Sequence, residues 1–339
     1  MLAACSATVI PAPTEPVSSH PAPTPGLPTS SVGPTTEPTA VPVAVGSAVA
    51  FWSPTHGIVV GAGADGRAAV WLTRDGGLTW TSGQLDLQPL SEVTVLGTSV
   101  AWAMTGCGAS ASTTGCGIVE SRDGGATWEQ VSDRDFQALD FVSSTDGWAV
   151  VDAGPNPGLA EHGGVFRSTD GGRTWVEISG RPCSTIGWPV GVSFVSQARG
   201  WLGCLGELGA GQGAKGVVET SDGGQTWVVR ARVNPPGTSL PDRGSISLSD
   251  YLDGISMRSS GSGLAWEGRG GTLRTLDSGR TWQTVPPGGS DAGPVPVDGW
   301  TATDLDWELL LWDGNLQGTA LWTSHDGGST WSSVGLVPR

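Results

Sequence analysis

Residues 121–128 read SRDGGATW, and five close variants of this octapeptide occur elsewhere in the chain. The other copies are TRDGGLTW (73–80), STDGGRTW (168–175), TSDGGQTW (220–227), TLDSGRTW (275–282) and SHDGGSTW (324–331). Their shared aspartates are Asp75, Asp123, Asp170, Asp222, Asp277 and Asp326, separated by 48, 47, 52, 55 and 49 residues. Self-similarity at a period of about 50 residues predicts a β-propeller or another repeat array.

Every residue type in the octapeptide suits a tight turn between two strands. Aspartate can bond its own backbone two residues on, and glycine supplies a positive φ without steric cost. The apolar residues before the turn read as an entering strand, and we expect the tryptophan after it to fill the layer between neighbouring sheets. We therefore assign the six aspartates a structural role, as opposed to catalysis or calcium binding. The same role is assigned to Trp80, Trp128, Trp175, Trp227, Trp282 and Trp331.

A hydrophobic pair of strands precedes each octapeptide, most clearly in LDFVSSTDGWAVVD (139–152) and VSFVSQARGWLGCLG (192–206). With the strands into and out of the turn, each unit supplies four antiparallel strands, which is one propeller blade. The sequence thus predicts an all-β fold: a single propeller of six four-stranded blades. Seven blades is the alternative, but the only room for another is 228–250, which reads as loop. One way to close the ring is for residues 40–46 to add a strand to the last blade.

The octapeptides resemble the Asp-box, or BNR, repeat of sialidases, sortilin-type receptors, xyloglucanases and photosystem II assembly factors. The pattern F-V-x-x-x-x-G-W-x-V, seen at 141–150, is similar to the repeat of photosystem II assembly factor-like propellers. The resemblance covers about residues 46–339. It implies a role in holding a protein partner, with the boxes placed away from the ligand, and it does not imply photosynthesis.

Composition excludes several other classes of protein. The chain of 339 residues has 54 Gly and 17 Trp but one Tyr and one Lys, and no segment shows a sustained helical period. Its net charge of −15, with scattered arginines, argues against nucleic-acid binding, which needs clustered basic residues. A closed ring leaves no open sheet edge, so we expect a monomer.

The N-terminal region predicts export and a lipid anchor. Residues 6–45 are rich in Pro, Ser and Thr and read as a disordered tether. Ahead of it, residues 1–5 end in LAAC, which resembles the bacterial lipobox, in which the cysteine, here Cys5, is lipidated after cleavage. We expect the true start to lie upstream, with Met1 inside the signal peptide; an accidental match is the alternative. The propeller would then be extracytoplasmic, touching the membrane through its lipid alone.

The four remaining cysteines form an even set without a CxxC motif or a histidine cluster, so no metal site is expected. Of the three possible pairings, the local one joins Cys107 to Cys116 and Cys183 to Cys204. Disulfides in loops would indicate an extracytoplasmic compartment.

The longer loops predict the functional face. In a four-stranded meander the octapeptide turns connect the third and fourth strands and share one face with the turns between the first and second strands. The loops between the second and third strands, such as 105–117, 153–164 and 206–216, lie on the opposite face. Function usually resides in elaborated loops on a rigid scaffold. The candidate ligand contacts there are Glu161, His162, Trp188, Glu207, Lys215, Arg243, Asp291 and Trp300.

No catalytic constellation is evident. A sialidase-like enzyme would need a tyrosine nucleophile, and the one tyrosine, Tyr251, has no clearly placed glutamate to activate it. A xyloglucanase-like carboxylate pair is harder to exclude, although those enzymes resemble two tandem propellers. No P-loop, dinucleotide or G-x-S-x-G motif occurs in a supporting context, so no cofactor is expected. We therefore favour a non-catalytic, assembly-factor-like module for an unidentified protein partner; the alternatives are a module for a cell-surface glycan and a glycosidase.

Overall fold

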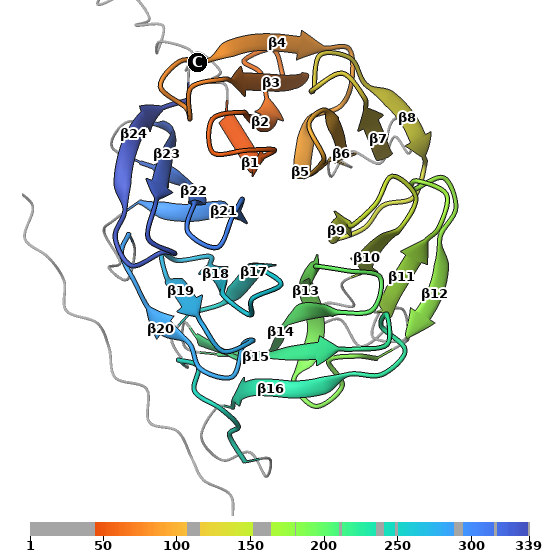
Figure 1. The fold of residues 1–339 in the computed structure, drawn as a ribbon, viewed down its shortest axis with the longest axis vertical. Coiled ribbons are helices and arrows are strands. Elements are labelled where there is room, and N and C mark those ends of the chain that lie inside the picture. The colour runs from red at the N-terminus through yellow and green to blue at the C-terminus, as the bar shows by residue number, and fades with distance from the viewer. Residues whose placement is uncertain are drawn as a thin grey trace, which may run out of the picture. The chain divides into compact units, whose positions relative to one another are not determined.

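The computed structural model describes residues 45–106, 116–151, 164–179, 181–209, 212–234, 241–247, 250–287, 294–314 and 317–337. These residues form strands and turns without a helix, and the strands make six four-stranded antiparallel sheets. The sheets stand side by side around a central axis as the blades of a propeller (Figure 1). The predicted six-bladed, all-β fold is confirmed.

The blades follow one another in chain order, and the first strand of each is the innermost (Figure 1). Blade 1 holds β1 (Val45–Phe51), β2 (Gly57–Ala62), β3 (Ala68–Thr73) and β4 (Thr81–Leu85). Blade 2 holds β5 (Leu90–Leu96), β6 (Val100–Thr105), β7 (Gly117–Ser121) and β8 (Glu129–Ser132). Blade 3 holds β9 (Ala138–Phe141), β10 (Gly147–Val151), β11 (Gly164–Ser168) and β12 (Val176–Ser179). Blade 4 holds β13 (Gly187–Phe194), β14 (Gly200–Gly209), β15 (Gln212–Thr220) and β16 (Val228–Val233). Blade 5 holds β17 (Leu252–Met257), β18 (Gly263–Glu267), β19 (Thr272–Thr275) and β20 (Gln283–Thr284). Blade 6 holds β21 (Val295–Thr301), β22 (Trp307–Asp313), β23 (Gly318–Ser324) and β24 (Ser332–Leu336).

Two details differ from the sequence expectation. The segment 228–250, expected to be loop, begins with β16, the outermost strand of blade 4. Val45 and Gly46 belong to β1, the innermost strand of blade 1, and pair with Ala62 and Gly61 of β2. The last blade is completed by its own β24, so residues 45–46 do not add a strand to it.

Each octapeptide closes its turn with the same set of hydrogen bonds. In blade 4, Asp222 accepts the backbone N–H of Thr226 at 2.9 Å through Oδ1 and the Thr226 hydroxyl at 2.6 Å through Oδ2. The Thr220 hydroxyl donates to the same aspartate and accepts the N–H of Gly224. Gly223 and Gly224 have φ angles of 77° and 97°, a region that side chains with a Cβ rarely adopt. The aspartate carboxylate is thus occupied by its own turn.

Six hydrophobic clusters form the core, one between each pair of neighbouring blades. One octapeptide tryptophan packs in or against each cluster, on the side of the preceding blade. From the junction of blades 6 and 1 onward these are Trp80, Trp128, Trp175, Trp227, Trp282 and Trp331. In the last five of these the indole N–H donates back to the turn, as Trp175 does to the Gly172 carbonyl at 2.9 Å.

The F-V-x-x-x-x-G-W motif has a packing explanation. Trp148 of β10 stacks on Phe194 of the next blade, with ring centroids 4.0 Å apart and planes at 7°. Its indole N–H donates to the Gly223 carbonyl, in the octapeptide turn of that same neighbour. The motif glycine is needed because a Cβ on Gly147 would lie 2.4 Å from the ring of Phe141. The motif therefore joins adjacent blades as well as adjacent strands.

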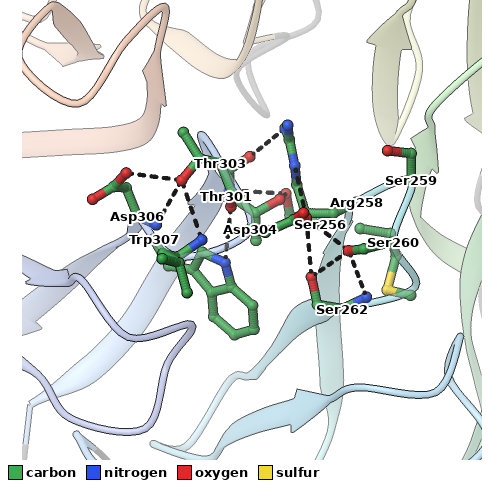
Figure 2. Close-up of polar contacts among 12 residues, drawn as sticks. Ser256, Arg258, Ser259, Ser260, Ser262, Thr301, Thr303, Asp304, Asp306 and Trp307 are labelled. Carbon is green, nitrogen blue, oxygen red and sulfur yellow. Dashed lines mark hydrogen bonds and ion pairs between the residues drawn. The ribbon is translucent and has the colours of Figure 1, made fainter.

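A second set of bonds links the innermost strands. Asp140, Ser193 and Ser256 occupy equivalent positions in blades 3, 4 and 5. Each accepts a backbone N–H from the next blade; the donors are Phe194, Met257 and Thr301. Figure 2 shows the third of these links, where the Ser256 and Thr301 hydroxyls lie 2.9 Å apart.

The junction of blades 5 and 6 is also bridged by charge. Arg258 donates to the Thr301 carbonyl at 2.8 Å and lies 4.0 Å from the Asp304 carboxylate (Figure 2). Asp304 accepts the Ser260 hydroxyl from across the junction at 2.7 Å. These contacts lie at the end of the blades where the octapeptide turns are found.

One disulfide braces the opposite end. Cys183, in the connection to β13, is bonded to Cys204 of β14, and both are buried. Cys116 is disulfide-bonded as well. Its expected partner Cys107 is outside the described residues.

Candidate functional site

The innermost strands share an irregularity that shapes the propeller axis. In five blades a β-bulge interrupts the pairing of the innermost strand with its neighbour. A bulge adds one residue to one strand and re-aims its side chain. The bulged residues are Ser47, Ser91, Val190, Asp253 and Val297, and Gln137 takes the equivalent place ahead of β9.

All six of these residues line one cavity of about 440 Å³, which we call the axial cavity. Its wall also includes Glu92, Met104, Gly106, Asp135, Phe136, Ala138, Gly191, Val192, Gly254, Ile255, Trp266 and Asp298. Gly106 follows β6, and Asp135 lies in the connection from β8 to β9. The axial cavity is therefore found at the end of the ring that carries the longer loops, away from the octapeptide turns.

The two carboxylates Glu92 and Asp298 directly follow the bulges of blades 2 and 6. In the other four blades the same position holds a small residue: Ala48, Ala138, Gly191 or Gly254. Asp298 is 7% exposed and accepts the Val49 N–H at 2.7 Å, while Glu92 is half-buried. No described residue donates a hydrogen bond to the Glu92 carboxylate.

Burial and mutual repulsion disfavour the ionised forms of these acids. Burial raises the pKa of Asp298 to about 7, against the opposing effect of the Val49 and Gly299 N–H groups. Burial, followed by the negative charges of Asp298 and Asp140, raises the pKa of Glu92 well above its usual range. Asp298 and Asp140 are therefore close enough to Glu92 to disfavour its charge.

A second acidic group lies on the blade 5 side. Burial, followed by the negative charge of Asp250, raises the pKa of Asp253 to about 6. The Asp253 side chain is nevertheless exposed to solvent at the axial cavity. Nearby, burial raises the pKa of Glu267 to about 7 despite its ion pair with Lys215. Burial likewise raises the pKa of Asp135. None of the described residues that line the axial cavity is a Lys, Arg or His.

The structure places the predicted contact residues apart from one another. Glu207 is exposed on β14, and Arg243 is exposed where its backbone pairs with Arg232. Trp188 is half-buried on β13 against the cluster between blades 4 and 5. None of these residues is among those that line the axial cavity.

Two further predicted contacts are occupied within the scaffold. Lys215 is fully buried in its ion pair with Glu267 of the next blade. Trp300 lies near the octapeptide end of β21, where its indole N–H donates to the Phe51 carbonyl at 3.0 Å. Glu161, His162 and Asp291 lie outside the described residues.

The acids of the axial cavity were not singled out from the sequence. Their signal appears when the five residues from each bulge are aligned as SAVAF, SEVTV, QALDF, VGVSF, DGISM and VDGWT. The second position is small in four segments and acidic in two. Across the described residues, no group of three His, Cys, Asp or Glu is arranged to hold a metal ion.

The comparisons with known proteins support the fold of the chain but do not assign it to a family. No protein-family model matches the chain, and no curated protein matches it. Among solved structures it is similar to YCF48 bound to a D1 peptide, at 18% identity over 86% of this chain and 82% of that one, with a TM-score of 0.46. It is also similar to the GH74 xyloglucanase from Xanthomonas campestris, at 13% identity over 86% of this chain and 45% of that one, with a TM-score of 0.53.

A third similar structure is the SapL1 lectin in complex with alpha methyl fucoside, at 10% identity over 88% of this chain and 95% of that one, with a TM-score of 0.54. The chain spans less than half of the xyloglucanase. At these identities the likeness to the xyloglucanase and the lectin is one of fold alone. No helix long and apolar enough to cross a membrane is found in the described part of the chain.

Proposed function

We propose that this chain is a non-catalytic propeller that holds a protein partner at the face bearing the axial cavity. The observation that carries the proposal is the cavity itself, because it lies on the axis at the end where loops of differing length gather. Binding residues are disproportionately found on loops that a rigid scaffold positions, and concave sites at the mouths of closed β structures are the usual ligand sites.

The rigidity of the scaffold supports a separation between the residues that build the ring and those that bind a partner. The octapeptide aspartates are saturated by their own turns, as Asp222 is by Thr226. Stacked rings such as Trp148 on Phe194 hold each blade to the next. The repeated residues therefore build the ring, which leaves the variable end for recognition.

The repeated motifs add a second line of support. Their resemblance to Asp-box repeats, and to photosystem II assembly factor-like propellers in particular, favours capture of a protein over hydrolysis. We further propose that the protein is extracytoplasmic and anchored by a lipid on Cys5. A buried disulfide between Cys183 and Cys204 agrees with an oxidising compartment, since such bonds are rare in reducing ones.

Site-specific photo-crosslinking tests the proposal. A photoreactive phenylalanine analogue replaces Gln137, exposed at the axial cavity, or Leu78, exposed on the octapeptide face, in the full-length chain in its native membrane. We expect one protein to be crosslinked from position 137 and not from position 78. Equal crosslinking from both faces, or from neither, contradicts the proposal.

A glycan array and a fluorogenic-glycoside panel test the other classes. Hydrolysis of any glycoside, with loss of that activity in a Glu92→Gln variant, would replace the proposed role with a glycosidase. Specific glycan binding without hydrolysis would replace it with a carbohydrate-binding module.

A further inference from the structure

The axial cavity combines a concave shape with an uncompensated charge. Its volume of about 440 Å³ falls within the roughly 300–1,000 Å³ typical of small-ligand sites. Four carboxyl groups line it, those of Glu92, Asp135, Asp253 and Asp298, and none of its described lining residues is basic. An acid inside a protein wall normally has a cation or several hydrogen-bond donors beside it.

Glu92 is the clearest departure from that rule. Its carboxylate receives no hydrogen bond from a described residue, and Asp298 and Asp140 are its charged neighbours. Asp298, by contrast, is anchored by the Val49 N–H. Two buried acids elsewhere in the ring do have cations: Glu219 pairs with Arg199 and Arg230, and Glu267 pairs with Lys215. Buried Glu308 is a further exception, because its Oε2 has no hydrogen-bond partner among the described residues. The axial cavity differs from the Glu219 and Glu267 sites in having no base among its described lining residues.

The wall of the axial cavity is not uniformly polar. Met104, Phe136 and Trp266 contribute apolar and aromatic surface beside the carboxyl groups. An aliphatic stem can pack on such surface while its charged end meets the acids, and an aromatic face attracts a cation directly. A long side chain with a terminal positive charge fits this combination better than a bare inorganic ion, for which the described residues supply no ligand set.

We infer that the axial cavity receives a lysine or arginine side chain of the protein partner, with Glu92 and Asp298 as the groups that meet its charge. This inference rests on the proposed function, because it assigns the chemistry by which that partner is recognised. A free organic amine has the same charged group, so the test below separates the two sources.

Blocked tripeptides provide the probe. Acetyl-Gly-Lys-Gly-amide and acetyl-Gly-Arg-Gly-amide are titrated into the full-length protein by calorimetry, beside the uncharged analogues that contain norleucine and citrulline. We expect the cationic peptides to bind and their uncharged analogues not to bind. Glu92→Gln should weaken binding at least about tenfold, because a hydrogen bond to a charged group is worth about 1.5–3 kcal/mol.

The chain offers a matched control in the same blade. Glu129 is exposed on β8, the outermost strand of blade 2, whereas Glu92 is on β5, the innermost strand. Glu129→Gln removes the same charge and should leave the affinity unchanged. Thermal unfolding of both variants shows whether each is folded before binding is compared. An Asp298→Asn variant with reduced affinity would give independent support if Glu92→Gln failed to fold.

Several results would overturn the inference. These are the absence of binding by either cationic peptide at millimolar concentration, equal binding of the norleucine analogue, and unchanged affinity in both Glu92→Gln and Asp298→Asn. Equal affinity for free putrescine would assign the cavity to a small amine and not to a partner side chain. If photo-crosslinking from position 137 captures a partner as efficiently with Glu92→Gln and with Asp298→Asn as with the parent, the proposed function stands while this inference fails.

Discussion

The Asp298 carboxylate accepts the backbone N–H of Val49 at 2.7 Å, which joins the last blade to the first across 249 positions of sequence. In the described part of the chain each blade contains four consecutive strands, and no strand is exchanged between the first and last blades. Closure depends on the apolar cluster between blades 6 and 1 and on a few polar contacts. Among the described residues the other two are the Gly46 N–H to the Thr319 hydroxyl at 3.2 Å and the Trp300 indole to the Phe51 carbonyl at 3.0 Å.

Replacement of Asp298 should test this closure. Asp298→Ala leaves the fully buried Val49 N–H without its acceptor, which typically costs about 1–3 kcal/mol. Asp298→Asn keeps an oxygen acceptor and removes a carboxyl group whose burial opposes its ionisation, so at pH 7 it should be at least as stable as the parent. Urea unfolding of the three proteins measures the difference. Equal losses for Ala and Asn would show that the hydrogen bond does not support closure.

Blade-to-blade stacking makes a second prediction. Trp148 is fully buried between Phe194 and the next octapeptide turn, so Trp148→Ala should cost about 3–5 kcal/mol. Trp148→Leu should cost less, because blades 1 and 5 carry Ile58 and Leu264 at the equivalent position. Thermal and urea unfolding check the order. A leucine variant as unstable as the alanine variant would mean that the ring stack cannot be replaced by aliphatic packing.

Leu78→Ala serves as the control for this series, since Leu78 is 73% exposed and touches no core cluster. It should change the unfolding midpoint little.

The octapeptide aspartates predict how the fold responds to acid. Hydrogen bonds from the Thr226 hydroxyl and N–H lower the pKa of Asp222 to about 2, and Thr330 does the same for Asp326. A folded pKa below the usual 3.8 means that these carboxylates stabilise the fold above about pH 4 and lose that effect as the pH falls toward 2. Asp222→Asn should therefore lower the unfolding temperature at pH 7, and the gap to the parent should narrow between pH 4 and 2. A gap that stays constant over this range would contradict the assignment.

The sequence predicts those features of the fold that are local or repeated. The octapeptide defines a turn because its aspartate, threonine and glycines bond within eight residues, as Asp222 does. The partner of a motif residue is less predictable: Phe194 stacks on Trp148, which belongs to another repeat. That contact depends on the angle between blades, which the period alone does not specify.

The candidate site was predictable only in its general position. The axial cavity is found at the end of the ring where the sequence predicts the longer loops. Its acids Glu92 and Asp298 lie 206 positions apart and become neighbours only through ring closure and the bulges before them. Lys215 shows the converse case. A single lysine in an acidic chain suggests a surface contact, yet strand β15 directs it to Glu267 of the next blade.

The acids at the axis predict a pH dependence opposite to that of the octapeptide turns. Burial raises the pKa of Asp140 and Asp253 to about 6 and that of Asp298 to about 7, so between about pH 4 and 7 the folded state binds more protons than the unfolded state. Stability should therefore fall as the pH rises through this window, which places the optimum near pH 4–5.

Because burial and the charges of Asp298 and Asp140 also raise the pKa of Glu92, Glu92→Gln should be more stable than the parent at pH 7 and should lose that advantage toward pH 4. Unfolding temperatures measured from pH 3 to 8 provide the test, with Glu129→Gln as the control that should follow the parent curve. A parent curve that rises steadily to pH 7, or a Glu92→Gln curve parallel to it, would show that these carboxyl groups are compensated at the axis by a cation.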